Sequence, residues 1–245
     1  MNLPVLCGLD LMTVAANIER VRQRIAAAAG RVSRRPEEIT LMAVTKMLPP
    51  DRIREAYAAG VRVFGENRVQ EFAGKAAAVR DLAEAEWHMI GHLQSNKAGK
   101  AAELYSAVDS IDSLKLAERL NAAAEKLHKR LAVLIEINIG GEEAKSGVAA
   151  EAPELQAILD AAPDLSNVTI RGLMTIPPFT KDPEQSRLFF RRLRELRERI
   201  SAQKYPAVSM DVLSMGMSHD FEVAIEERST CVRVGTAIFG ERTNA

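Results

Sequence analysis

The sequence predicts one closed barrel of eight alternating strands and helices, an α/β fold of the TIM or (β/α)₈ type, with an extra N-terminal helix. The chain has 245 residues, a length that such barrels commonly use as a single domain. Eight short apolar runs alternate with segments of helical periodicity, which is typical of parallel βαβ units. No linker or low-complexity tract interrupts the pattern, so we expect one domain over residues 1–245.

The predicted elements follow one another in a regular order. Residues 11–29 carry apolar side chains at helical spacing and predict the first helix. Further helices are expected at 51–59, at 113–129 and after Asp182, whose side chain would cap a helix that opens with Pro183. The predicted strands are 39–45, 61–65, 86–91, 107–111, 131–138, 168–176, 210–216 and 231–236.

The helix that should follow the last strand is missing from the sequence. Only five residues remain after Phe239-Gly240, too few for a helix of the outer ring. We therefore expect the additional N-terminal helix to fill the gap that this missing helix leaves.

The charge balance and the cysteine content argue against several classes of protein. Lys+Arg and Asp+Glu both number 33, so nothing in the net charge indicates binding to nucleic acid or to a membrane surface. Cys7 and Cys231 lie far apart and in no metal or redox spacing, which fits a reducing cytosol. The N-terminus lacks the regions of a secretory signal, and no apolar run is long enough to span a bilayer. We expect a cytoplasmic protein.

Lys46 follows directly after the first predicted strand and precedes the turn Met47-Leu48-Pro49-Pro50. In a barrel of this kind, the reactive residues lie at the C-terminal ends of the strands. Desolvation lowers the pKa of a lysine, and a partly neutral amine can attack a carbonyl group and form a Schiff base. The alternative is a lysine that simply emerges into solvent at the end of a strand.

Two predicted loops have the chemistry of phosphate binding, and they follow strands seven and eight, where this fold often binds phosphate. The seventh strand ends in Ser214-Met215-Gly216-Met217-Ser218, where Ser218 would cap the next helix and backbone N–H groups would face an anion. The eighth ends in Arg233-Val234-Gly235-Thr236, where Gly235 permits close approach and Thr236 adds a hydroxyl. Either loop alone also fits an ordinary tight turn.

Arg233 and Gly235 lie two residues apart and therefore share one face of the eighth strand. If Gly235 faces a phosphate, Arg233 reaches inward at the barrel mouth, where a buried guanidinium needs a partner. Two partners are open: a pyridine nitrogen, which a permanently protonated arginine keeps unprotonated, or a carboxylate such as Glu136. A reactive amine, two phosphate loops and an inward arginine together suggest pyridoxal 5′-phosphate.

Six stretches of the chain, in order from the first predicted strand to the last, form a more specific pattern. They are Ala43-Val44-Thr45-Lys46, Phe64-Gly65-Glu66-Asn67-Arg68-Val69-Gln70-Glu71, Trp87-His88-Met89-Ile90-Gly91-His92-Leu93-Gln94-Ser95-Asn96-Lys97, Arg171-Gly172-Leu173-Met174-Thr175-Ile176-Pro177, Ser214-Met215-Gly216-Met217-Ser218 and Val232-Arg233-Val234-Gly235-Thr236-Ala237-Ile238-Phe239-Gly240. As a set they resemble the YggS/PROSC family of pyridoxal phosphate homeostasis proteins.

The resemblance implies a barrel similar to the N-terminal domain of alanine racemase, with pyridoxal phosphate held by Lys46 as a Schiff base. It places Arg233 at the pyridine nitrogen and Asn67 near the ring. One departure is Glu227-Arg228, which stands where the family tends to have a small residue and a glycine before strand eight. The residues that the resemblance places around the phosphate are Ser214, Ser218, Gly235 and Thr236.

Three other patterns do not predict a site. Residues 140–146 lack the second glycine of a P-loop, and Lys145 is expected only as a mobile cation near the barrel mouth. His88 and His92 are four apart but not on a predicted helix, so we expect satisfied polar side chains and no metal site. Residues 187–199 predict a solvated amphipathic helix rather than a nucleic-acid surface.

The resemblance implies a carrier or reservoir of pyridoxal phosphate without dedicated turnover, with apo pyridoxal-phosphate enzymes as candidate partners, and its single-domain form favours a monomer. The runner-up is an amino-acid racemase, which needs a base on each face of the substrate. A third reading is an enzyme of unknown substrate with His88 or His219 as its base. The racemase reading lacks an evident second base, because no tyrosine is predicted at a C-terminal strand end: Tyr57, Tyr105 and Tyr205.

Overall fold

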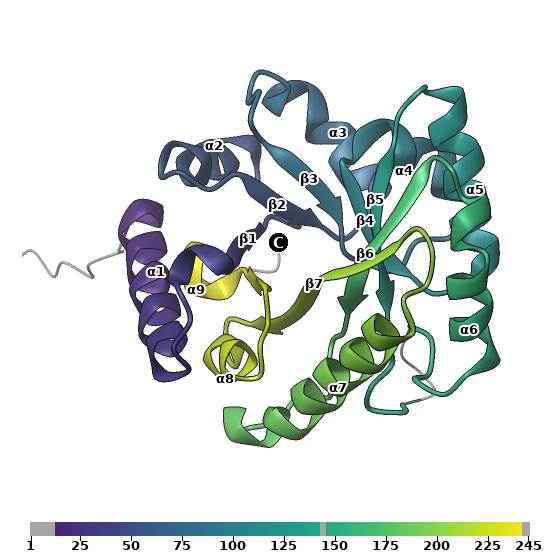
Figure 1. Ribbon diagram of the computed structural model, residues 1–245. Coiled ribbons are helices and arrows are strands. Elements are labelled where there is room, and N and C mark those ends of the chain that lie inside the picture. Colours follow the sequence, from purple (N-terminus) through teal and green to yellow (C-terminus); the bar gives the residue numbers. More distant parts are fainter. Residues whose placement is uncertain (1–12, 143–145, 242–245) are drawn as a thin grey trace, which may run out of the picture.

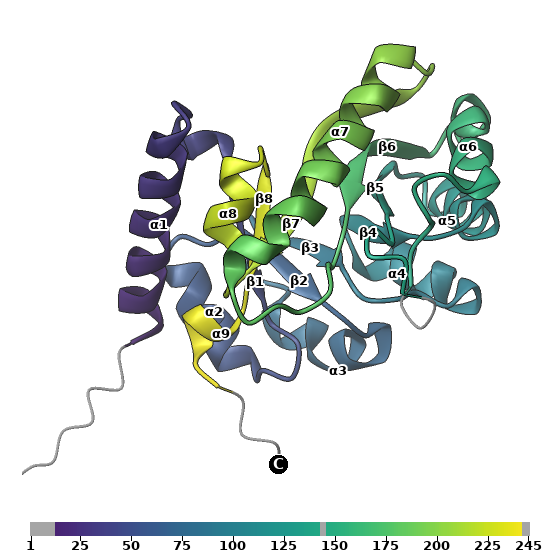
Figure 2. The ribbon, with the colours of Figure 1, turned by 90° about the horizontal axis from the view of Figure 1, so that it is seen from below.

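The computed structural model describes residues 13–142 and 146–241, and within them the predicted barrel is confirmed. Eight parallel strands close into a ring in chain order, and helices surround the ring (Figures 1 and 2). Cys7 and Lys145 lie outside the described residues, and a single domain over 1–245 stays a prediction. The strands are β1 (Thr40–Val44), β2 (Val63–Glu66), β3 (Glu86–Met89), β4 (Ala107–Ile111), β5 (Leu131–Glu136), β6 (Val168–Met174), β7 (Val208–Met217) and β8 (Cys231–Val234).

The helices alternate with the strands as expected. The Ser113 hydroxyl caps α5 by accepting a hydrogen bond from the Leu116 N–H at 3.3 Å. Asp182 also caps as predicted, since its side chain accepts from the Glu184 N–H at 3.0 Å, although the first turn is a 3₁₀ helix before α7 begins. The helices are α1 (Val14–Arg31), α2 (Pro50–Ala58), α3 (Val69–Val79), α4 (Ala98–Leu104), α5 (Leu114–Lys126), α6 (Pro153–Asp160), α7 (Arg187–Gln203), α8 (Phe221–Glu226) and α9 (Thr236–Phe239).

Helix α1 fills the gap in the outer ring, as predicted. It packs against α2, α8 and α9, and in the outer ring it lies between α2 and α8 (Figure 1). Its buried face is the predicted apolar stripe, and Arg24 fastens the helix to Glu222 of α8 through two hydrogen bonds of 3.0 and 2.8 Å. The short α9 buries only Ile238, whereas α1 adds its whole apolar stripe to the same hydrophobic core.

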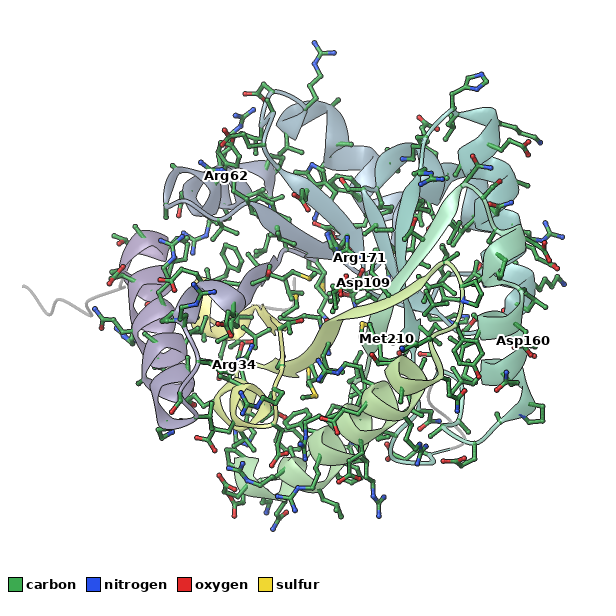
Figure 3. All side chains as sticks on the ribbon, in the orientation of Figure 1. Arg34, Arg62, Asp109, Asp160, Arg171 and Met210 are labelled. Atoms are coloured by element: carbon green, nitrogen blue, oxygen red, sulfur yellow. The ribbon has the colours of Figure 1, made fainter. Side chains whose placement is uncertain are left out.

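The inside of the barrel is partly polar at the N-terminal ends of the strands. His88 of β3 lies with its Nδ1 at 3.1 Å from both carboxylate oxygens of Asp109 of β4, and Figure 3 labels Asp109 near the barrel centre. Both side chains line a cavity of about 400 Å³, and Cys231 at the start of β8 is also part of its lining. His92 pairs with Asp112 at 3.0 Å, so both histidines have the satisfied polar roles that the sequence predicted.

The Glu227-Arg228 turn before β8 keeps the backbone shape that a glycine favours. Arg228 has φ 73°, in the left-handed region, and its side chain is exposed. Glu227 is buried and lies within 3.5 Å of three arginines of α7: Arg187, Arg191 and Arg194. These arginines therefore have local partners within the fold. Across the described residues, no helix is both long and apolar enough to cross a membrane.

Replacing Arg228 with glycine is expected to stabilise the protein. A non-glycine residue in the left-handed region costs about 1–3 kcal/mol, and glycine loses about 0.5–1 kcal/mol in backbone entropy, so the free energy of unfolding should rise by about 1 kcal/mol. Urea unfolding measures the change. Arg80→Gly is the matched control, because Arg80 is exposed with φ −65° and should lose stability. If Arg228→Gly and Arg80→Gly destabilised the protein equally, the backbone at Arg228 would not be strained.

The His88–Asp109 pair is expected to make stability fall as pH rises. Burial lowers the pKa of His88, but the attraction and hydrogen bond of Asp109, with help from Glu86, outweigh burial and raise the pKa to about 10. A group with a raised folded pKa stabilises fully below its unfolded pKa, near 6.5, and loses that contribution up to about pH 10. Unfolding free energies measured from pH 6 to 10 should therefore decline, and His88→Gln should flatten the decline.

The same substitution gives a second measure of the pair. His88→Gln leaves Asp109 buried without its cation, which should cost about 3–5 kcal/mol. His92→Gln is the control, because the His92 side chain is 57% exposed and a surface pair contributes less than about 1 kcal/mol. Similar losses in the two variants would show that the His88–Asp109 pair stabilises no more than a surface contact.

Candidate functional site

Lys46 lies where the sequence predicted it, at the C-terminal end of β1. Thr45 continues the sheet, since its N–H donates to the Gly65 carbonyl of β2 at 2.9 Å. The chain then turns, with the Leu48 N–H donating back to the Thr45 carbonyl at 3.2 Å, so Lys46 and Met47 are the two central residues of the turn. Lys46 is half-buried in this turn at the barrel mouth.

A buried group of charges beneath this turn was not predicted from the sequence. Lys75 of α3 is 7% exposed, and its amine lies 2.8 Å from Glu66 Oε1 and 2.9 Å from Glu71 Oε1. The same amine donates to the Thr45 carbonyl at 2.9 Å. Burial raises the pKa of Glu66, and its attraction to Lys75 opposes that rise. The available signal was the Glu71–Lys75 spacing of four on a helix that also buries apolar residues.

Arg233 points into the barrel, as predicted, and is 3% exposed. It donates to the Ser214 hydroxyl of β7 at 2.6 Å and to the Thr175 carbonyl after β6 at 2.7 Å. Burial lowers the pKa of this guanidinium, while nearby acidic groups oppose the change. Among the described residues no carboxylate forms an ion pair with Arg233, so the alternative of a direct pair with Glu136 is not observed.

Ser218 joins the two predicted phosphate loops. Its hydroxyl oxygen accepts hydrogen bonds from the Gly235 N–H at 3.2 Å and from the Ala237 N–H at 3.3 Å. The prediction that Ser218 caps the next helix is wrong, because α8 begins at Phe221 after Asp220. The Asp220 carboxylate accepts a hydrogen bond from the Met217 N–H at 2.8 Å, so this side chain has a partner within the loop.

The loop after β7 turns tightly against α8 at Gly216. Gly216 has φ 93°, and an added Cβ would lie 2.6 Å from the Ala224 side chain of α8. Gly235 is buried, and Thr236 beside it is exposed at the mouth. Ser218, Gly235 and Thr236 thus lie close together after β7 and β8, with the Ser218 oxygen holding the two N–H groups and its own O–H left as a donor.

Asn67 follows β2 at the same end of the barrel. Its Oδ1 is buried and has no hydrogen-bond partner among the described residues. Gly91 packs so closely on the Asn67 backbone that an added Cβ would lie 2.4 Å from the Asn67 carbonyl oxygen. The Oε2 of Glu136, at the end of β5, also lacks a partner in the described chain, and burial raises the pKa of this carboxyl. A buried polar atom without a partner is costly, which is typical of a ligand site.

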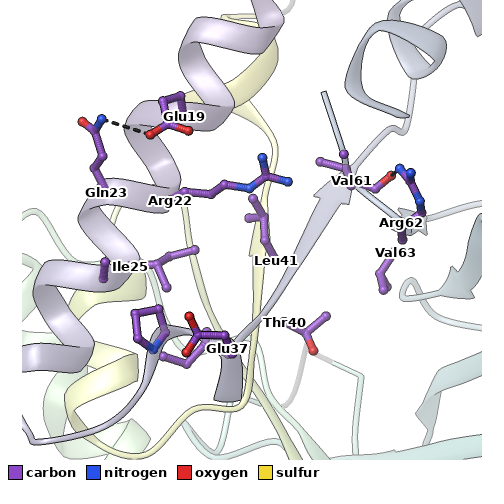
Figure 4. A pocket seen from close by; sticks show the side chains of 14 residues that line it. Glu19, Arg22, Gln23, Ile25, Glu37, Thr40, Leu41, Val61, Arg62 and Val63 are labelled. Atoms are coloured by element: carbon purple, nitrogen blue, oxygen red, sulfur yellow. Dashed lines mark hydrogen bonds between the residues drawn. The ribbon is translucent and has the colours of Figure 1, made fainter. Parts of the chain in front are cut away.

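Two other features of the described residues do not form a comparable site. A pocket of about 640 Å³ lies between α1 and the N-terminal ends of β1 and β2, opposite the mouth (Figure 4). Three of its polar side chains already have partners, since Gln23 donates to Glu19 at 3.1 Å and Arg22 to the Ala59 carbonyl at 3.0 Å. No group of three potential metal ligands occurs within the described chain.

The family of the alanine racemase N-terminal domain matches residues 9–243. The pyridoxal phosphate homeostasis protein of Aquifex aeolicus is 46% identical over 94% of this chain and 99% of its own length. This chain belongs to the family of pyridoxal phosphate homeostasis proteins. The resemblance that the sequence motifs indicated is therefore confirmed.

Two solved structures are also similar to this chain. PipY of Synechococcus elongatus, solved with pyridoxal phosphate bound, has a TM-score of 0.80 and 37% identity, over 93% of this chain and 100% of its own. An alanine racemase of Clostridium difficile has a TM-score of 0.68 and 16% identity, over 93% of this chain but 57% of its own. The likeness to the racemase shows the fold alone.

Proposed function

We propose that this protein binds pyridoxal 5′-phosphate at the mouth of its barrel, through a Schiff base on Lys46, and serves as an intracellular carrier or reservoir of the cofactor. The observation that carries the proposal is the convergence of a half-buried lysine, a buried arginine and a hydroxyl-rich donor cluster at one end of the barrel. Within the family, this donor set fits an aldehyde that carries a phosphate and a pyridine ring.

The phosphate end of the site is the cluster around Ser218. A phosphate ester needs several N–H and O–H donors, and the Ser218 hydroxyl already gathers the Gly235 and Ala237 N–H groups. Thr236 adds a hydroxyl from the exposed side. The contact of Ser214 with Arg233 favours a role in orienting that arginine, beside the phosphate role that the resemblance implied.

The ring end of the site is Arg233. A guanidinium has five N–H donors, and two of its nitrogens donate to Ser214 and Thr175, so donors remain for a pyridine nitrogen. Arginine cannot give up its proton there, so the ring nitrogen stays unprotonated. When bound, pyridoxal phosphate supplies an electron-accepting ring, and an unprotonated nitrogen weakens that property. Asn67 offers the unpartnered Oδ1 beside the ring.

Among the described residues, no tyrosine lies at this mouth to serve as the second base of a racemase. The three tyrosines precede strands rather than follow them: Tyr57 lies in α2 before β2, Tyr105 before β4 and Tyr205 before β7. His88 lies near the opposite end of the barrel and is engaged with Asp109. His219, next to Ser218, remains the one histidine beside the loop after β7 in the described chain, and its ring packs on Phe179 with centroids 5.6 Å apart.

The carrier proposal extends to location and partners. A cofactor reservoir acts in the cytoplasm, where enzymes that use pyridoxal phosphate are made, and its exchange partners are apo forms of those enzymes. The half-buried position of Lys46 lets an incoming amine reach the Schiff base and release the cofactor. We propose a single domain and a monomer, because the site is assembled from one barrel.

Ser218→Ala and Ser214→Ala are expected to weaken binding in different ways. Loss of the Ser218 hydroxyl removes a donor to phosphate, so the Kd for pyridoxal phosphate should rise about tenfold while that for pyridoxal stays nearly constant. Loss of the Ser214 hydroxyl removes a contact that orients Arg233 toward the ring, so the Kd should rise for both pyridoxal phosphate and pyridoxal. Absorbance titrations give the Kd of each variant for each ligand. Equal effects of both variants on both ligands would contradict the assignment of Ser218 to the phosphate and of Ser214 to the ring.

Lys46 is expected to be the single residue that borohydride links to the cofactor. The purified protein should be yellow, and reduction should leave a pyridoxyl-phosphate adduct on one peptide, located by mass spectrometry. Lys46→Ala should be colourless, while Lys97→Ala, which removes a lysine in the loop after β3, should keep the native spectrum. A principal adduct on Lys97 or Lys145 would overturn the assignment of Lys46.

The same protein tests the carrier against the racemase. A carrier transfers its cofactor to an apo enzyme and leaves either alanine enantiomer unchanged beyond trace level. Rapid racemisation in deuterated water, with deuterium at Cα and loss of activity in Lys46→Ala, would overturn the carrier proposal.

A further inference from the structure

The turn that carries Lys46 is fastened to helix α3 by the buried charges beneath it. The Lys75 amine contacts three oxygens within 2.9 Å: the Thr45 carbonyl, Glu66 Oε1 and Glu71 Oε1. Glu66 also accepts the Thr45 hydroxyl at 2.6 Å and is fully buried. The residue before Lys46 is therefore held through both its carbonyl and its side chain, which fixes where the Lys46 side chain leaves the backbone.

The residue after Lys46 is held from the same cluster. Met47 has φ 61°, at the turn position where glycine is favoured, although its side chain is 63% exposed and gains little from packing. Its N–H donates to Glu71 Oε1, the same oxygen that Lys75 contacts. The turn thus adopts a strained backbone that its own sequence does not favour, and Glu71 is the contact that keeps it there.

We infer that Glu66, Lys75 and Glu71 are positioning residues that orient the Lys46 amine toward the ring end of the barrel mouth. The inference rests on the proposed function, since it concerns the affinity of Lys46 for an aldehyde. The cluster touches the backbone on both sides of Lys46, at Thr45 and Met47, so its effect on the amine passes through the turn. None of the three groups belongs to the donor cluster around Ser218 or to the contacts of Arg233.

The position of the cluster predicts a signature that a phosphate-binding residue cannot have. Formation of the Schiff base needs the amine in reach of the carbonyl carbon, with or without a phosphate on the ligand. Loosening the turn should therefore weaken pyridoxal phosphate and pyridoxal by the same factor. Ser218→Ala, in contrast, should weaken only the phosphorylated ligand. Comparing the two ligands separates orientation of the amine from capture of the phosphate.

The test uses Glu71, because its side chain is 26% exposed and its removal leaves Lys75 paired with Glu66. Glu71→Ala removes the acceptor of the Met47 N–H, and Glu71→Gln keeps an oxygen at that place as the rescue variant. Glu103→Ala removes a helix carboxylate paired with Lys100 at 2.8 Å, far from the turn, and is the matched control. Ile158→Val, in the core of α6, reports whether a loss of stability alone affects binding.

Two measurements are made on each full-length variant. In cofactor-free protein, amide hydrogen exchange at Met47 should quicken by about tenfold or more in Glu71→Ala and stay within about threefold of native in Glu71→Gln. In absorbance titrations, Glu71→Ala should raise the Kd of both pyridoxal phosphate and pyridoxal by about tenfold, with both control variants near native.

The outcomes distinguish the two proposals. Faster exchange at Met47 with unchanged affinity for both ligands would overturn the positioning role, as would a loss confined to pyridoxal phosphate or an equal loss in Ile158→Val. Unchanged amide exchange at Met47 in Glu71→Ala would show that Glu71 does not hold the turn. If native protein forms no adduct on Lys46, the proposed function fails, and the exchange experiment still reports on the turn because it needs no cofactor.

Discussion

The pairing of β1 with β8 is the contact on which the site depends. It closes the barrel in the register that sets Met42 opposite Arg233 and Ala43 opposite Val234. Because the strands are parallel, the end of β8, which carries Arg233 and is followed by Gly235, lies at the same mouth that Lys46 reaches from β1. Residues from the two ends of the chain therefore converge, and an open sheet of the same strands would separate them by its full width.

Closure also forces charged groups into a small interior, where His88, Asp109 and Arg233 each have a specific partner. At the N-terminal end of the barrel, His88 and Asp109 neutralise one another. At the mouth, Arg233 donates to a hydroxyl and a carbonyl rather than to a carboxylate. These two hydrogen bonds use part of the guanidinium's N–H donors and do not neutralise its charge. A carboxylate partner would stabilise the empty site more strongly and would compete with a ring nitrogen for the same donors.

Two strained residues lie beside the functional loops, and each is held by tertiary contacts. Arg228 takes the left-handed backbone in the turn into β8, where the neighbouring Glu227 is anchored by three arginines of α7. Met47 does so in the turn after β1, where Glu71 and Lys75 hold the backbone. In both places a local cost is offset by a cluster of charges from another helix, so the shape of the loop survives a residue that does not favour it.

The fold and the place of Lys46 at the end of a strand could be predicted from the pattern of residues alone. Apolar runs report which residues are buried in a strand, and the alternation of strands and helices admits few topologies, so β1 lies within one residue of its predicted bounds at each end. The same periodicity predicted Arg233 and Gly235 on one face of a strand over 231–236, but β8 ends at Val234 and Gly235 already turns into α9 with ψ −75°. The partners follow from tertiary contacts: Ser218 meets Gly235 and Ala237 instead of capping α8, and Lys75 reaches Thr45. These contacts depend on strand register and on the length of side chains across neighbouring elements, and local patterns carry no record of either.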